Sequence, residues 1–325
     1  MTFPYTENQV NRPDQEKPLS DNSQADGNLN SIEHRLRNVL HFIDQHLDGD
    51  LSIEALSAVA HLSPFHFHRL FASRFDISVF RYVQLCRFKS ASYRLAYRSQ
   101  DQVIDIALDH GYDEPESFAR AFKRHLGQSP SAFRHAPHWQ NWYDFQQPLK
   151  NLRNQHMRST PQEIAKTEIR CIDFGETAIA AFEHRGDPAL IGQSIRQFIE
   201  WRRAQKLSPQ SYATFNILYD HPELVAAKDF RFDIATAIGG RDQHELQQSL
   251  VNGLVLKTIP AGRCAVMRHY GSDDNLELSI RRLYEEWLPQ SGVELRDFPL
   301  FLQRRNFFPE VNEAALETDI FLPIQ

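Results

Sequence analysis

The sequence predicts an all-α N-terminal domain with two helix-turn-helix motifs joined by a long helix, followed by an α+β C-terminal domain. Two internal repeats carry this prediction. Residues 63–71 recur 51 positions later as 114–122, and both copies are typical of a helix that begins at a proline. Residues 178–186 recur as 263–271, and each copy is a strand-like run followed by a helical one. The first repeat indicates DNA binding, and the second indicates internal twofold pseudosymmetry.

The bulk properties set limits on the class of protein. A chain of 325 residues is long enough for two cores. Its three cysteines lie far apart without a C-x-x-C spacing, so neither a zinc site nor a disulfide framework is expected, and no cofactor motif occurs. No apolar run approaches 18 residues and no signal pattern opens the chain, so we expect a cytoplasmic protein without a membrane span.

Net charge alone does not indicate DNA binding. The whole chain carries a formal charge of -6, and residues 31–136 hold thirteen basic and twelve acidic side chains. A nearly neutral segment of this kind has no general electrostatic attraction for DNA. The placement of individual basic residues must therefore carry the argument.

The expected helices follow one another in order. Residues 1–30 are polar and predict a disordered tail, so the DNA-binding domain is expected over 31–136. An amphipathic helix begins near Ser31, Ser52 caps a short helix, and Ser63-Pro64 opens the first recognition helix. Asp76 and its counterpart Gly127 are expected in left-handed conformation at helix ends.

A long helix over 79–97 separates the two motifs. At 1.5 Å per residue it spans about 28 Å, close to the roughly 34 Å between successive major grooves on one face of B-DNA. A short helix over 103–109, a turn at Gly111 and a helix opened by Pro115 complete the second motif. The helix length suits two reading heads in successive grooves.

Residues 137–165 are expected to form a linker, although their aromatic cluster should pack partly on a domain. The C-terminal domain, 166–325, reads as a strand-helix-strand-strand unit that occurs twice. Its later strands are expected at 215–219 and 230–238, and at 298–303 and 318–322. One sheet with a groove along the internal twofold follows from this arrangement.

Residues 34–136 resemble the DNA-binding domain of the AraC/XylS family of transcription regulators. The resemblance rests on Leu56…Ala60, Ser63-Pro64, Arg69-Leu70-Phe71, Ile104-x-Ile106-Ala107 and Gly111-Tyr112…Ser117-Phe118-x-Arg120-x-Phe122-Lys123…Gly127-x-Ser129-Pro130-x-x-Phe133-Arg134. Residues 168–325 resemble a GyrI-like effector-binding domain. This second match rests on Pro260-Ala261-Gly262, His269-Tyr270-Gly271, Trp287-Leu288-Pro289-Gln290-Ser291-Gly292 and Asp319-Ile320-Phe321-Leu322-Pro323.

The resemblances imply a regulator that binds promoter DNA with its N-terminal half and senses a small, often amphipathic or cationic, molecule with its C-terminal half. RNA polymerase is expected as a further partner. Two departures concern the ligand. GyrI-like domains often carry a glutamate after Pro299, where this chain reads Phe301-Leu302-Gln303, and Asp187-Pro188 follows Gly186 where an aromatic residue is common. Loss of the glutamate favours a neutral or less cationic ligand.

In a helix-turn-helix, the first residues of the second helix reach the bases. The first head offers Phe65, His66, His68 and Arg69, and Arg69 suits bidentate contact with guanine. The second head offers Glu116, Ser117, Arg120, Lys123 and Arg124. Because glutamates at 114 and 116 oppose a polyanion, we expect the first head to read sequence and the second to hold phosphates.

The histidines raise the question of a metal site. His66 and His68 are two residues apart, unlike the i, i+4 pair that a helical metal site uses. His184 and His269 occupy matching repeat positions and are expected to approach each other across the twofold. A structural or groove-lining role is favoured for them over metal binding.

The groove walls are expected to include Glu183, Trp201, Phe215, Tyr219, Tyr270, Trp287 and Phe301. The alternative is that about half of the aromatic ones are plain core. Two other activities stay open for this domain: a hydrolase using Glu183 or Glu200 as acid or base, and a protein-binding adaptor. No coiled-coil pattern occurs, so a monomer on a two-groove DNA site is expected.

Overall fold

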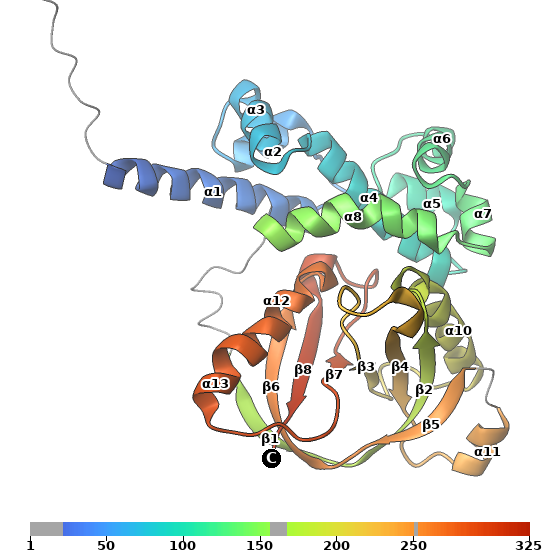
Figure 1. Cartoon of the computed structure of the whole chain (residues 1–325). Helices are drawn as coiled ribbons and strands as arrows, with labels where there is room; N and C mark the ends of the chain where they lie inside the picture. Colours follow the sequence, from blue (N-terminus) through green and yellow to red (C-terminus); the bar gives the residue numbers. More distant parts are fainter. Residues whose placement is uncertain (1–21, 157–167, 250–252) are drawn as a thin grey trace, which may run out of the picture.

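The structure is a computed structural model that describes residues 22–156, 168–249 and 253–325. A helical domain lies over a curled antiparallel sheet, as Figure 1 shows. The N-terminal helices are α1 (Asn22–Gln45), α2 (Ile53–Val59), α3 (Pro64–Phe75), α4 (Val79–Tyr97), α5 (Val103–Leu108), α6 (Pro115–Leu126), α7 (Pro130–His135) and α8 (Trp139–His156). Helix α1 begins nine residues before its predicted start, and the rest of the predicted tail lies outside the described residues.

Local capping explains the boundaries of the first motif. The Ser52 hydroxyl accepts from the Ala55 amide at 3.2 Å, and the Ser63 hydroxyl accepts from the His66 amide at 3.4 Å. The second copy differs, because the Glu114 side chain makes no capping bond. Its longer side chain fits the first-turn amides less well than serine does.

The helix ends follow the predicted backbone. Asp76 closes α3 at φ 55° and Gly127 closes α6 at φ 75°, both left-handed. Helix α4 occupies the predicted range from Val79 to Tyr97, and its N-cap Ser78 accepts from the Arg81 amide at 3.1 Å. Phenylalanines 67, 71, 118 and 122 are fully buried against one helical core. The duplicated scaffold is therefore confirmed.

The predicted linker over 137–165 is mostly the helix α8, and this prediction is wrong for Trp139–His156. The aromatic residues that looked unsuited to a tether are the reason. Trp139 and Phe145 are buried in the core of the helical domain, and the Trp139 ring also covers Gly192 of the second domain. A side chain at 192 would meet that ring at 2.5 Å. Helix α8 thus packs between the two domains (Figure 1).

The C-terminal domain is one eight-stranded antiparallel sheet in the order β1-β6-β8-β7-β3-β4-β2-β5. Its strands are β1 (Arg170–Phe174), β2 (Thr177–Arg185), β3 (Thr214–Leu218), β4 (Arg231–Ala237), β5 (Leu254–Ile259), β6 (Gly262–Tyr270), β7 (Phe301–Arg304) and β8 (Glu317–Pro323). Strands β1 to β4 correspond to β5 to β8 in the repeat, and corresponding strands lie at equal distances from the centre of the sheet. The pseudo-twofold therefore passes between β3 and β7. The strand-helix-strand-strand unit is confirmed, but each copy also has a leading strand, β1 or β5, that was not predicted. In β1 four of the five residues are exposed, so it lacks the alternating apolar signal of a half-buried strand.

Helices and short turns connect the strands of this domain. They are α10 (Ile191–Ala204), α11 (Gln243–Gln248), α12 (Leu276–Arg281), the π-helix η4 (Arg282–Trp287), α13 (Leu288–Ser291), and the short 3-10 turns η1 (Pro188–Leu190), η2 (Ala227–Asp229), η3 (Asp273–Asn275) and η5 (Glu313–Ala315). Helices α10 and α12 pack on separate apolar clusters, one for each half of the sheet. The opposite face has its own core, in which the Phe301 and Phe321 rings stack 4.8 Å apart.

Candidate functional site

The two recognition helices α3 and α6 project from the two ends of α4, on the side away from the sheet (Figure 1). The predicted base-reading residues lie on this surface. Phe65 is 63% exposed, an unusual position for an apolar ring. Ser117 is half-buried. The other seven candidates are exposed: His66, His68, Arg69, Glu116, Arg120, Lys123 and Arg124.

The two heads differ in how their arginines are held. The Arg69 guanidinium lies over the Phe65 ring, 4.7 Å from its centroid, and has no carboxylate partner among the described residues. Arg120 donates to the Ser117 hydroxyl at 3.0 Å. A guanidinium over an aromatic ring, with no carboxylate partner, still has N–H donors for a bidentate acceptor.

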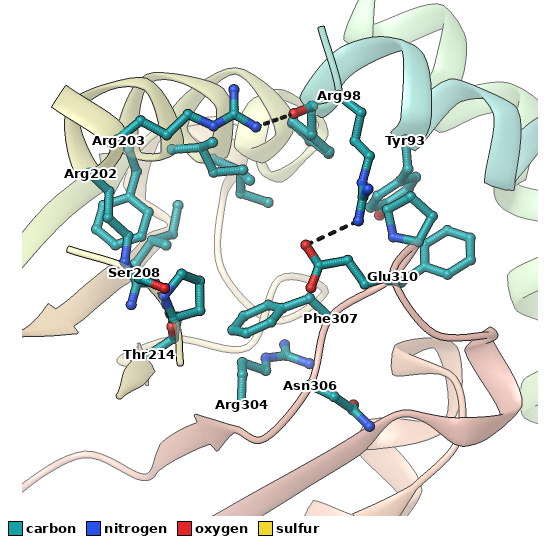
Figure 2. A pocket seen from close by; sticks show the side chains of 18 of the residues that line it. Tyr93, Arg98, Arg202, Arg203, Ser208, Thr214, Arg304, Asn306, Phe307 and Glu310 are labelled. Atoms are coloured by element: carbon teal, nitrogen blue, oxygen red, sulfur yellow. Dashed lines mark hydrogen bonds and ion pairs between the residues drawn. The ribbon is translucent and has the colours of Figure 1, made fainter. Parts of the chain in front are cut away.

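A cavity of about 590 Å³ lies on the helix-bearing side of the sheet, over the pseudo-twofold. Its floor comes from the central strands through Thr214, Asn216, Ile234 and Arg304. Helix α10 and the turn after it form one wall, and the segment 306–310 forms the other (Figure 2). The size fits a drug-sized molecule.

The roof of this cavity belongs to the DNA-binding domain. Tyr93 and Tyr97 of α4 and its C-cap Arg98 line it directly, and Figure 2 shows Tyr93 and Arg98 above the sheet residues. Two contacts connect this roof to the walls. Arg203 of α10 donates to the Tyr97 carbonyl at 2.7 Å, and Arg98 pairs with Glu310 at 3.1 Å. The helix α4 that separates the two reading heads therefore also forms the roof of the cavity.

None of the seven predicted groove residues lines this cavity. Phe215 and Phe301 face the core on the other side of the sheet, because side chains alternate along a strand and the cavity takes Thr214 and Asn216 instead. Trp201 of α10 is buried in the apolar cluster of the first half, and Trp287 packs against that of the second half. Tyr219 donates to Asp233 at 2.9 Å on the far face, and Tyr270 is 61% exposed at the end of β6.

Glu183 also lies away from the cavity. Its carboxylate is 2.5 Å from Lys257 Nζ and 2.9 Å from Arg185. The hydrogen bond from Lys257 holds the pKa of Glu183 below its ordinary value despite partial burial. A carboxylate that stays ionised in an ion-pair cluster is a poor general acid.

His184 and His269 do not approach each other, and that prediction is wrong. They lie on β2 and β6, which four strands separate in the sheet. Each instead contacts its own helix: His184 Nδ1 is 2.9 Å from the Ser194 hydroxyl, and His269 Nδ1 is 2.8 Å from Ser279. Burial lowers the pKa of both imidazoles. They are matched structural links between strand and helix.

A buried ion network joins the two domains beside the cavity, and sequence reasoning missed it. Arg153 of α8 is 0% exposed and lies within 2.8 Å of Asp44, Asp274 and Glu313. Lys89 of α4 pairs with the same Asp274, at 2.7 Å, and with Glu313. Asp274 and Glu313 belong to the sheet domain, whereas the other three belong to the helical one. The partners lie more than 100 residues from Arg153, so no sequence pattern could associate them.

Two exposed helix-turn-helix heads on a shared spacer, joined to a domain with a ligand-sized cavity, define a DNA-binding transcription regulator. Residues 167–325 match the family model of the GyrI-like small molecule binding domain, and residues 56–136 match that of a helix-turn-helix domain. The chain belongs to the AraC-type transcriptional regulators that carry a GyrI-like domain. Curated relatives that match either half of the chain carry the names of transcriptional regulators.

The relatives agree with this assignment. "Probable transcriptional regulator YgiV" of Escherichia coli K12 is 32% identical over 158 residues, which is 48% of this chain and 96% of that protein. "Transcriptional regulator Rob" of Salmonella typhimurium is 29% identical over 104 residues, 32% of this chain and 36% of that protein. Among solved structures, the DNA-binding domain of AdpA in complex with a target DNA is 29% identical, covers 31% of this chain and 91% of that chain, and has a TM-score of 0.30. In the part of the chain that the structure describes, no helix is long and apolar enough to cross a membrane.

Proposed function

We propose that the chain is a ligand-responsive regulator whose GyrI-like domain senses a small molecule in the cavity under α4. The observation that supports this is the roof made by Tyr93, Tyr97 and Arg98. A ligand there contacts the helix that sets the spacing and orientation of both reading heads. Such a ligand changes DNA binding only if it binds two arrangements of α4 with different affinity.

The regulator is proposed to act as a cytoplasmic monomer that occupies two successive major grooves and contacts RNA polymerase from the bound promoter. The length of α4 supports the two-groove geometry. Ligand binding then alters promoter affinity, polymerase contact or both.

Ligand-dependent stabilisation tests the sensing proposal. Screened against a library of small amphipathic compounds, the protein should melt at higher temperature with at least one of them, by an amount that rises with concentration. Ser208→Trp places a large ring at the cavity mouth and should abolish the shift. Ser211→Trp is the matched control, because Ser211 is also exposed and lies outside the lining. Capture of a protein from lysate with no compound-dependent shift would instead indicate the adaptor function.

The reading heads are proposed to have unequal roles. Arg69→Ala should reduce the difference in binding free energy between operator and unrelated DNA by about 1–3 kcal/mol, and so remove discrimination between them. Arg120→Ala and Lys123→Ala should weaken binding to all sequences similarly and lower its salt dependence. Binding-site selection with each variant measures this difference. Equal loss of selectivity from the two heads contradicts it.

A further inference from the structure

The cavity carries positive charge that its own carboxylates do not balance. Two cations at its edge are paired, Arg98 with Glu310 and Arg304 with Asp273. Three others, Arg202, Arg203 and Lys206, have no carboxylate partner among the described residues. All three come from the end of α10 and the turn that follows it, so the excess charge is concentrated on one wall (Figure 2).

Arg202 is the most informative of the three because it is only 5% exposed. Its guanidinium donates to neutral oxygens alone: the Leu207 carbonyl at 2.5 Å, the Tyr212 carbonyl at 2.5 Å and the Thr214 hydroxyl at 2.6 Å. Burial without a counter-charge lowers its pKa to about 10. A guanidinium has five N–H donors, so two have no acceptor among the residues that the structure describes, and Arg202 lines the cavity.

The end of α10 explains only part of this charge. A helix C-terminus carries a partial charge of about -0.5 and favours nearby cations. Three full positive charges exceed that amount several-fold. Arg203 and Lys206 are exposed, and Arg203 uses one donor on the Tyr97 carbonyl of α4. Both therefore remain available to a ligand in the cavity, which they line.

The rest of the lining is apolar and aromatic. Phe198 and Ile199 stand on the α10 wall, Phe307 and Phe308 on the opposite wall, and Tyr93 lies above. Flat rings on two sides favour a planar apolar body, whereas one charged wall favours an acidic head group.

We propose that the ligand of this cavity is an aromatic or similarly apolar carboxylate, whose acidic group lies at Arg202, Arg203 and Lys206. This inference rests on the proposed sensing function and adds the chemical class of the ligand. The body of the ligand lies between Phe198 and Phe307 under the tyrosines of α4. An anion there supplies the counter-charge that Arg202 lacks, and it also contacts the residue that bonds the α4 backbone, Arg203.

Three probes with one ring system and different charge test the proposal by calorimetry. They are 2-naphthoate, neutral 2-naphthamide and cationic 2-naphthylmethylammonium. Naphthoate is expected to bind at least about tenfold more tightly than the amide, the factor that one charge-assisted hydrogen bond supplies. The ammonium compound should bind most weakly. Binding of naphthoate should weaken as salt is raised.

Variants distinguish the charge proposal from the cavity proposal. The double variant Arg203→Gln with Lys206→Gln keeps the buried Arg202 and should weaken naphthoate about tenfold or more while leaving naphthamide within about twofold. Arg170→Gln with Lys228→Gln is the control, because it removes two exposed positive charges outside the cavity. Ser208→Trp should abolish binding of every probe.

The outcomes separate the two claims. If naphthamide or the ammonium compound binds as tightly as naphthoate, and Ser208→Trp abolishes it, the anion class is wrong and the sensing cavity stands. The same conclusion follows if the control double variant weakens naphthoate as much as the cavity one. If no probe binds, or if Ser208→Trp changes nothing, both the ligand class and the proposed site are wrong.

Discussion

Replacing Arg153 by alanine is expected to lower the free energy of unfolding by about 3–5 kcal/mol, as removal of one partner from a buried ion network does. The substitution removes a positive charge from Asp44 and Glu313. Both side chains are buried, so water cannot replace that charge. Because the network spans the domain boundary, the two domains should also unfold in separate transitions. Denaturant unfolding, followed by probes in both domains, measures the loss.

Lys150→Ala is the matched control for that measurement. Lys150 lies on the same helix, α8, but its pair with Glu223 is a surface contact of 3.7 Å. Such pairs contribute about 0–1 kcal/mol. Equal effects of the two substitutions would contradict a stabilising role for the network. A single cooperative transition in the Arg153 variant would contradict its role in joining the domains.

The second large effect is a contrast between two aspartates of the same network. Asp274→Asn is expected to cost about 3 kcal/mol or more, whereas Asp44→Asn should cost less than about 1 kcal/mol. Three carboxylates face only two cations here, so one negative charge is in excess. Burial raises the pKa of Asp44 in spite of Arg153. Burial also opposes ionisation of Asp274, but Lys89 and Arg153 outweigh it and hold its pKa well below the usual range.

The pH dependence follows from these directions. The charges of Arg153 and Lys89 also outweigh burial at Glu313 and lower its pKa. A carboxyl with a lowered folded pKa contributes stability above its unfolded pKa, near 4, and that stability is lost as the pH falls toward the folded value. The wild-type protein should therefore lose stability in acid more steeply than Asp274→Asn. Equal costs for the two asparagine variants, or parallel acid profiles, would overturn this assignment of charge.

The sequence predicted the scaffold better than the cavity. Helix α4 occupies the predicted range from Val79 to Tyr97, and Ser78, a preferred type of N-cap residue, directly precedes it. Phe215 was expected to line the groove, but it lies in the core on the other face of the sheet, because both faces carry buried apolar residues. A period-2 pattern identifies a strand but does not say which of two apolar faces holds a cavity.

The contribution of α4 to the cavity roof had no signal in the sequence. Tyr93 and Tyr97 appear there as ordinary apolar positions of a spacer helix, and their cavity partners in α10 lie about 100 residues later. The same is true of Arg153, which resembles any basic residue in the last turn of a helix. Contacts between domains depend on how the folded units pack, and a single sequence does not contain that information in local form.

The most direct test of the account is the affinity of 2-naphthoate for the free protein and for the protein saturated with its selected operator. If a ligand under α4 is coupled to the reading heads, operator DNA should change the dissociation constant of naphthoate by about fivefold or more, and naphthoate should change operator affinity by the same factor. Ser208→Trp should remove both effects while leaving operator binding itself intact. A naphthoate dissociation constant that is identical with and without operator would contradict coupling between the cavity and the DNA-binding surface.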